Sequence, residues 1–199
     1  MKKIGIVIRD FEENNKIFVG CRRDVVDIFL NYAVDIILIP IYLSWDRVLS
    51  LVHLCDGIVL TGGDHFYSND FLLVRYLYHN NIPTLGICLG MQAMALSFGS
   101  GKELTVDIHN LKNNDTHDII IQKNTLLYDI LGQEHIKVNS RHQTGISATN
   151  LSVSAKAGDG VIEAVEDAKK RFFLGVEWHP ESLNDKNSDL IFAAFMKSL

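Results

Sequence analysis

Short apolar runs alternate with amphipathic stretches along the first half of the chain. Continuous apolar runs occupy positions 3–8, 35–40, 57–61 and 84–87. Apolar residues recur at helical spacing over positions 22–33, 45–54, 69–80 and 90–98. Uninterrupted apolar strands are typical of a parallel sheet that is covered on both faces. The alternation therefore predicts an α/β fold with a mostly parallel central sheet flanked by helices. The acidic, asparagine-rich stretch 10–16 is interpreted as a polar loop.

The pattern changes after position 98. Short β-like segments follow at 105–108, 117–122, 136–138, 151–155, 161–165 and 172–176. Turn residues, among them Asn150 and Asp159-Gly160, separate several of these segments. A strand-rich region with hairpins is therefore expected in the second half of the chain. Apolar positions at helical spacing over 189–199 predict a closing helix.

Composition indicates an ordinary globular protein. The chain has 199 residues, 47% of them hydrophobic and 22% charged, and a formal net charge of −5. A single domain over 1–199 is expected. The negative charge argues against a nucleic-acid partner, and no apolar run is long enough to cross a membrane. The three cysteines, at irregular spacing, suit a reducing compartment and hence the cytoplasm. No metal-ligand spacing appears, so no metal or cofactor is expected.

Cys88 is the strongest candidate for chemistry. It stands between Gly86 and Gly90, at the point where an apolar strand gives way to a helical pattern. A G-x-C-x-G turn repeats the pattern of the elbow that presents a nucleophile between strand and helix. The positive end of the helix dipole there is expected to favour the thiolate. The alternative is a buried packing cysteine, because cysteine is among the most buried residue types.

A second stretch, positions 175–181, carries a base and an orienting group. His179 and Glu181 alternate with Pro180, so on an extended segment their side chains would point to the same side. A nucleophilic cysteine needs such a base, and the base needs a group that orients it. Ligands of parallel sheets bind beyond the carboxyl ends of the strands, where Gly62-Gly63 also lies. An N–H of that loop is expected to help stabilise an oxyanion.

Three stretches together resemble class I glutamine amidotransferase domains. They are positions 61–64, 86–92 and 175–181, and the resemblance spans nearly the whole chain. It implies a flavodoxin-like sheet and a Cys-His-Glu triad made of Cys88, His179 and Glu181. Positions 138–143, followed by 157–164, are similar to the central signature of stand-alone γ-glutamyl-γ-aminobutyrate hydrolases. The closer likeness is therefore to hydrolases of γ-glutamyl-amines.

The resemblance also implies a mechanism and a set of site residues. Cys88 would attack the γ-carbonyl of a small-molecule γ-glutamyl amide, giving a thioester and then glutamate and free amine. Backbone N–H groups of Leu89, Gly62 and Gly63 would form the oxyanion hole. The implied substrate-binding residues are Gln92, Asn139, Ser140, Arg141, His142 and Gln143. For Gln92 the alternative is a polar residue on the outer face of a helix.

Other functions stay open at this point. The chain could be a glutaminase subunit that passes ammonia to a separate synthase partner. A non-catalytic binding protein would need a lost catalytic residue, and none is lost. Leu73 and Arg141 stand where these hydrolases commonly carry Glu and His, which leaves the identity of the amine open. Whether the chain forms a homodimer is also left open.

Overall fold

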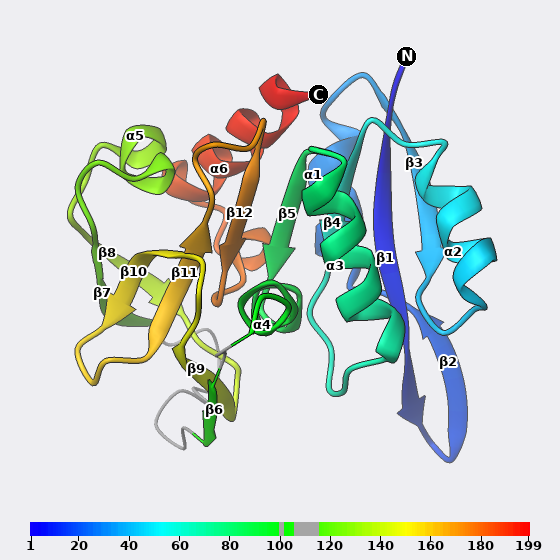
Figure 1. The fold of residues 1–199 in the computed structure, drawn as a ribbon, viewed down its shortest axis with the longest axis horizontal. Coiled ribbons are helices and arrows are strands. Elements are labelled where there is room, and N and C mark those ends of the chain that lie inside the picture. Colours follow the sequence, from blue (N-terminus) through cyan, green and yellow to red (C-terminus); the bar gives the residue numbers. More distant parts are fainter. Residues whose placement is uncertain (100–101, 106–115) are drawn as a thin grey trace.

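A computed structural model describes residues 1–99, 102–105 and 116–199 of the chain (Figure 1). The strands are β1 (Lys2–Glu13), β2 (Lys16–Gly20), β3 (Val34–Pro40), β4 (Gly57–Leu60), β5 (Thr84–Ile87), β6 (Lys102–Thr105), β7 (Thr116–Ile121), β8 (His135–Asn139), β9 (Thr144–Ala148), β10 (Ser152–Ala157), β11 (Ile162–Glu166) and β12 (Phe173–Val176). The helices are α1 (Arg23–Leu30), α2 (Trp45–Val52), α3 (Ser68–His79), α4 (Leu89–Leu96), α5 (Leu126–Leu131) and α6 (Lys186–Ser198), with a 3₁₀ turn, η2, at Pro180–Ser182.

The central sheet is parallel in its first half and antiparallel in its second. Strands β3, β1, β4, β5 and β12 pair in parallel, in that spatial order. Antiparallel pairing then continues from β12 through β11, β10 and β7 to β8. This confirms the predicted α/β fold with a mostly parallel core and a strand-rich second half. The carboxyl ends of β1, β4, β5 and β12 meet at one edge of the sheet, because parallel strands share a direction.

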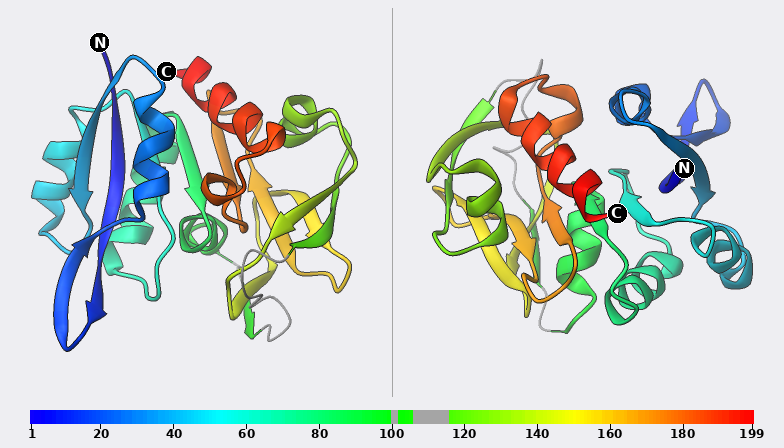
Figure 2. Two further views of the ribbon diagram at one scale, coloured as in Figure 1. Left: turned by 180° about the vertical axis from the view of Figure 1, so that it is seen from behind. Right: turned by 90° about the horizontal axis from the view of Figure 1, so that it is seen from above.

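Helices cover both faces of the sheet (Figures 1 and 2). Helices α1, α5 and α6 pack with one side of the strands, and α2, α3 and α4 pack with the other. Neighbouring residues of a strand contribute to opposite cores. Val59 lies in the first core, and Ile58 and Leu60 lie in the second. A strand that is buried on both faces appears in the sequence as a continuous apolar run. This explains why such runs predicted these strands.

The prediction of a polar loop over 10–16 is wrong. Strand β1 continues to Glu13, and β2 returns antiparallel to it, with Phe11 opposite Phe18. Asn14 and Asn15 turn the hairpin with φ of 53° and 58°. Two central residues with positive φ suit the twist of a two-residue hairpin turn. Side chains on both faces of this hairpin are largely exposed, so no buried-exposed alternation marked it.

Other differences concern short elements of the second half. Helix α5 and strand β9 were not predicted. The amino end of α5 is capped from a distant strand, since the Glu166 carboxylate accepts from the N–H groups of Leu126 and Leu127 at 2.6 and 3.0 Å. Thr125 also caps this end locally by accepting from the Tyr128 N–H at 3.2 Å, whereas the bonds to Glu166 leave no signature near α5 in the sequence. Of the strand predicted at 105–108, residue 105 ends β6, and 106–108 lie outside the described residues.

Within the described ranges, none of the helices has both the length and the apolar character required to cross a bilayer.

Candidate functional site

The carboxyl end of β5 forms a strained turn that presents Cys88. Its φ of 51° lies in the left-handed region, which residues other than glycine seldom adopt. A Cβ on Gly90 would lie 2.2 Å from the Leu60 carbonyl oxygen, and a Cβ on Gly86 would lie 2.5 Å from the Met94 sulfur. The glycines of the G-x-C-x-G pattern are therefore required by packing. They let α4 begin directly against β4.

Burial makes Cys88 a weak acid in the free protein. Only 7% of the residue is exposed. Desolvation raises the pKa of the thiol well above its usual value, and the Glu177, Glu181 and Glu163 carboxyls raise it further. The Leu89 backbone N–H opposes this and lowers the pKa. The N–H at the start of α4 acts in the expected direction and favours the thiolate, but burial and negative charge outweigh it. Attack by sulfur therefore requires a base that takes its proton.

His179 is held from two sides. Its Nδ1 lies 2.7 Å from Glu181 Oε1, and both side chains are buried. The Asn139 amide clamps its backbone: Asn139 Nδ2 donates to the His179 carbonyl at 3.0 Å, and the His179 N–H donates to Asn139 Oδ1 at 2.8 Å. The segment is not extended as predicted. The 3₁₀ turn at Pro180–Ser182 curls Glu181 back onto the imidazole.

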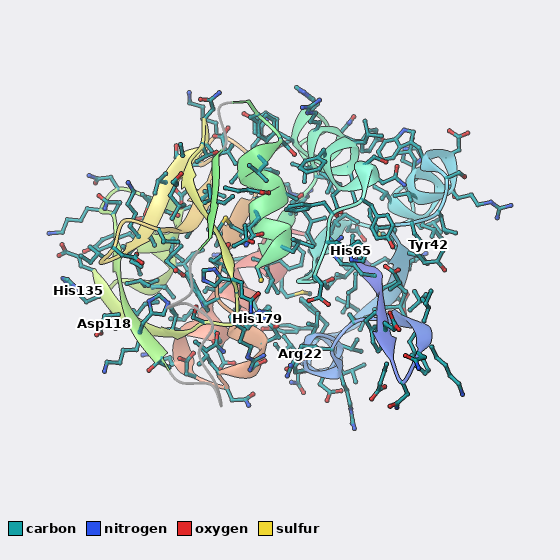
Figure 3. The ribbon with its side chains drawn as sticks, turned by 90° about the horizontal axis from the view of Figure 1, so that it is seen from below. Arg22, Tyr42, His65, Asp118, His135 and His179 are labelled. Carbon is teal, nitrogen blue, oxygen red and sulfur yellow. The ribbon has the colours of Figure 1, made fainter. Side chains whose placement is uncertain are left out.

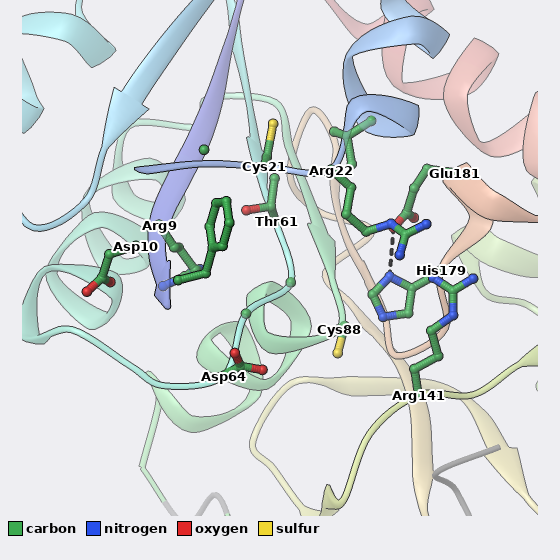
Figure 4. Close-up of a pocket in the computed structure, with 15 residues that line it drawn as sticks. Arg9, Asp10, Cys21, Arg22, Thr61, Asp64, Cys88, Arg141, His179 and Glu181 are labelled. Carbon is green, nitrogen blue, oxygen red and sulfur yellow. Dashed lines mark hydrogen bonds and ion pairs between the residues drawn. The ribbon is translucent and has the colours of Figure 1, made fainter. Parts of the chain in front are cut away.

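The structure brings Cys88 and His179 together beside Gly62. A Cβ at Gly62 would lie 3.2 Å from His179 Cε1 and 3.5 Å from Cys88 Cβ. The sulfur and the imidazole therefore flank the same short loop at the carboxyl end of β4. Figure 4 shows both, with Glu181 behind the imidazole. Seen from below in Figure 3, His179 and Arg22 lie at this edge, whereas Asp118 and His135 lie on β7 and β8.

Two cavities meet at Cys88, each of about 420 Å³. The first cavity is lined by Arg9, Asp10, Phe11, Gly20, Cys21, Arg22, Val25, Thr61, Gly62, Gly63, Asp64, Cys88, Arg141, His179 and Glu181. The second cavity is lined by Gly63, Asp64, Cys88, Leu89, Gln92, Arg141, His142, Gln143 and Thr144. Most of the residues predicted from the sequence therefore lie on these walls. Asn139 and Ser140 are not among the lining residues, and Asn139 instead positions His179.

Gln92 is buried, so the alternative of an outer-face polar residue is wrong. Only 3% of it is exposed. Its Nε2 donates to the Thr144 carbonyl at 2.7 Å and to a carboxylate oxygen of Glu177. The amide nitrogen is therefore held by two acceptors, and Gln92 lines the second cavity. His142 lies next to the same carboxyl, with Nδ1 3.2 Å from Glu177 Oε1.

Sequence reasoning missed a buried ion pair behind the Gly62-Gly63 loop. The Arg9 guanidinium donates to both oxygens of Asp70, at 2.8 and 2.6 Å. Asp70 also accepts from the Tyr67 N–H at the start of α3. A Cβ on Gly63 would lie 2.4 Å from Arg9 Cδ, so the pair supports this loop from behind. Arg9 and Asp70 are charged residues, and the sequence pattern around them did not indicate that their side chains are buried.

The family model for peptidase C26 matches residues 67–181, which is more than half of the chain. The chain belongs to this family. The finding confirms the resemblance to class I glutamine amidotransferase-like domains at the level of the family. Among curated relatives, a glutamine amidotransferase-like protein of Rickettsia prowazekii is 29% identical, over 80% of this chain and 83% of that protein. A CTP synthase of Porphyromonas gingivalis is 25% identical over 71% of this chain, which spans only 33% of that enzyme.

Solved structures of glutamine amidotransferase-type proteins share the fold. The glutaminase domain of the Trypanosoma brucei CTP synthase, with bound acivicin, aligns with a TM-score of 0.74 over 99% of this chain and 94% of that one, at 20% identity. A glutamine amidotransferase of Methylobacillus flagellatus aligns with a TM-score of 0.69 over 100% of this chain and 96% of that one, at 12% identity. At these identities the likeness establishes the architecture, and the chemistry has to be argued from the site.

Proposed function

We propose that this protein hydrolyses the γ-glutamyl amide bond of a γ-glutamyl-amine, through a thioester on Cys88. The proposal is supported by three facts of geometry. Cys88 stands on a strained elbow, His179 flanks the same Gly62 loop, and Glu181 holds the imidazole at 2.7 Å. The family supports amide hydrolysis in general.

The first half of the reaction acylates the enzyme. The Glu181 carboxylate accepts from Nδ1–H, which leaves Nε2 of His179 as the base. Nε2 takes the thiol proton while sulfur bonds to the γ-carbonyl carbon, and the π electrons move to the carbonyl oxygen. Backbone N–H groups of Leu89 and the Gly62-Gly63 loop stabilise that oxyanion. When the carbonyl re-forms, the C–N bond breaks and Nε2–H protonates the departing amine.

The second half releases glutamate. Water attacks the thioester carbonyl while Nε2 of His179 accepts one of its protons. The oxyanion collapses, the C–S bond breaks, and the proton returns to the sulfur. The net reaction consumes one water and one amide, and it produces glutamate and an amine. General base activation suits this site because burial raises the pKa of Cys88, so little thiolate exists before the substrate binds.

One observation carries the proposal: the Glu181–His179 hydrogen bond beside the buried Cys88. The purified protein should release glutamate from at least one member of a panel of γ-glutamyl amides. Cys88→Ala should lower turnover at least about a thousandfold, whereas Cys55→Ala is the matched control. Cys55 lies outside both cavities and donates to the Leu51 carbonyl at 3.3 Å. Turnover that survives Cys88→Ala would refute the covalent route.

The alternative is a glutaminase subunit that delivers ammonia to a separate synthase. It is favoured by the similarity to CTP synthase, in which the matching region is about a third of the protein. In that case glutamine alone would be turned over among the panel, and the rate would rise when the synthase is added. A cavity of about 420 Å³ beside the nucleophile favours the hydrolase, since ammonia needs far less room.

A further inference from the structure

The β1–β2 hairpin supplies an apolar wall to the first cavity. Phe11 and Gly20 reach it from the two strands, and Cys21 and Val25 continue the wall into α1. Phe11 stacks on Phe18 across the hairpin, with ring centroids 5.7 Å apart and planes inclined by 21°. Phe11 nevertheless remains 44% exposed. An aromatic side chain that borders a cavity and is only half covered gains from apolar contact with a ligand.

Most of the charged side chains around this cavity already have hydrogen-bond partners. A charged ligand in this cavity would have to compete with those partners for hydrogen bonds, or else would lose its hydration without gaining a counter-charge. Arg22 and Asp64 are both exposed to solvent, which screens their charges. The pairs are Arg9 with Asp70, Arg22 with Asp24, Asp10 with the Tyr67 hydroxyl, and Arg141 with the Ser182 hydroxyl.

The two cavities differ in the chemistry of their walls. The second cavity presents Gln92, His142, Gln143 and the Thr144 segment, which suit the amino and carboxylate groups of a glutamyl head. The first lies on the other side of Cys88 and adjoins His179, the residue that protonates the departing nitrogen. The departing group would therefore extend into the first cavity, whose volume of about 420 Å³ accepts a group of ring size.

We infer that the amine released by this enzyme carries an uncharged apolar body, and that Phe11 of the β1–β2 hairpin selects for it. This inference rests on the proposed function and names its substrate class. A γ-glutamyl amide of an arylalkyl amine fits it. Amides of amines that end in an ammonium or a carboxylate fit it less well, because most charged groups of the wall already have hydrogen-bond partners and solvent screens Asp64.

The first experiment compares four substrates with the wild-type protein. They are γ-glutamyl benzylamide, γ-glutamyl methylamide, γ-glutamyl putrescine and γ-glutamyl-γ-aminobutyrate. The benzylamide should have the highest kcat/KM, about tenfold or more above the methylamide. A preference for the putrescine or aminobutyrate amide would overturn the inference, because it would show that charge recognition prevails over apolar contact.

The second experiment tests the residue. Phe11→Ala should lower the benzylamide-to-methylamide ratio of kcat/KM about tenfold, and Phe11→Leu should recover part of it. Ile17→Ala is the matched control and should keep the ratio. Ile17 pairs with Glu12 on the opposite face of the same hairpin and is 74% exposed. An unchanged ratio in Phe11→Ala, with the fold verified by circular dichroism, would overturn the assignment.

A binding measurement separates the inference from the proposed function. If none of the four amides is turned over, the hydrolase proposal fails, but the pocket can still be tested. Calorimetry on Cys88→Ala should show that the benzylamide binds about tenfold more tightly than the methylamide, with the difference lost in Cys88→Ala/Phe11→Ala. Equal binding of both amides would reject the apolar pocket whatever the chemistry.

Discussion

Replacing Asn139 with alanine tests whether a side chain outside the cavities positions the base. Asn139 is fully buried, and both ends of its amide bond the backbone of His179, at 3.0 and 2.8 Å. The resemblance implied that Asn139 binds the substrate. The structure instead assigns it to the segment that carries the imidazole, so the expected defect is in kcat and in stability more than in KM.

The magnitude follows from which groups lose their partners. The His179 carbonyl keeps a second donor, the Ser182 N–H at 3.1 Å, and so loses only one bond. The buried His179 N–H loses the acceptor that Asn139 Oδ1 provides. One net hydrogen bond and one unsatisfied buried donor together amount to roughly 2–4 kcal/mol of unfolding free energy. A base displaced by a fraction of an ångström should also lower kcat by about 10- to 100-fold.

Urea unfolding and steady-state kinetics measure the two effects separately. Asn69→Ala is the control, since Asn69 Nδ2 also donates two bonds to backbone, to Ile41 and Leu43 at 2.8 and 2.7 Å, and lies outside both cavities. It should lower stability and preserve kcat. If Asn139→Ala keeps the wild-type kcat, or loses less than about 0.5 kcal/mol, the positioning argument is refuted.

Three further predictions concern packing and charge. Gly90→Ala should cost about 3 kcal/mol or more in urea unfolding, because its Cβ would lie 2.2 Å from the Leu60 carbonyl oxygen. Burial raises the pKa of Glu177 well above 4.5, so the folded protein loses stability as pH rises above that value. Glu177→Gln removes this loss and should therefore raise Tm at neutral pH. In scanning fluorimetry the gain in Tm should vanish at about pH 4, where the carboxyl is protonated in the folded and unfolded states alike. Asp70→Ala leaves the Arg9 guanidinium buried and unpaired, and should cost about 3–5 kcal/mol by urea unfolding.

The glycine and aspartate variants each have a matched control. Gly158→Ala should be nearly neutral, since no atom lies within 4 Å of the added Cβ. Asp27→Ala breaks an exposed pair with Arg23 and should cost less than about 1 kcal/mol. Equal losses in a variant and its control would show that the packing or charge argument is wrong. If Glu177→Gln raises Tm by the same amount at every pH, the argument that Glu177 has a raised pKa in the folded protein is wrong.

Local patterns determined the central elements because their physical cause is local. Apolar runs such as 57–61 and 84–87 predict buried strands, since every residue of such a strand contacts one core or the other. The G-x-C-x-G turn was recognisable because the glycines on either side of Cys88 are required by the bend itself. The match to the family then followed from the order of three short stretches, without any contact being known.

Tertiary structure alone decided what depends on distant neighbours. The hairpin of β1 and β2 carries Phe11 on the wall of the first cavity. Its residues are largely exposed on both faces, so it left no periodic signal in the sequence. The charge state of Cys88 depends on burial and on Glu177, which lies far along the chain. The role of Asn139 depends on where a 3₁₀ turn brings His179. The sequence by itself therefore determined the central strands and indicated the candidate reactive groups, because strand burial and turn geometry are encoded within a few residues. Only the folded chain decided the raised pKa of Cys88 and the walls of the two cavities, because desolvation and hydrogen bonding depend on contacts between segments that are remote in sequence.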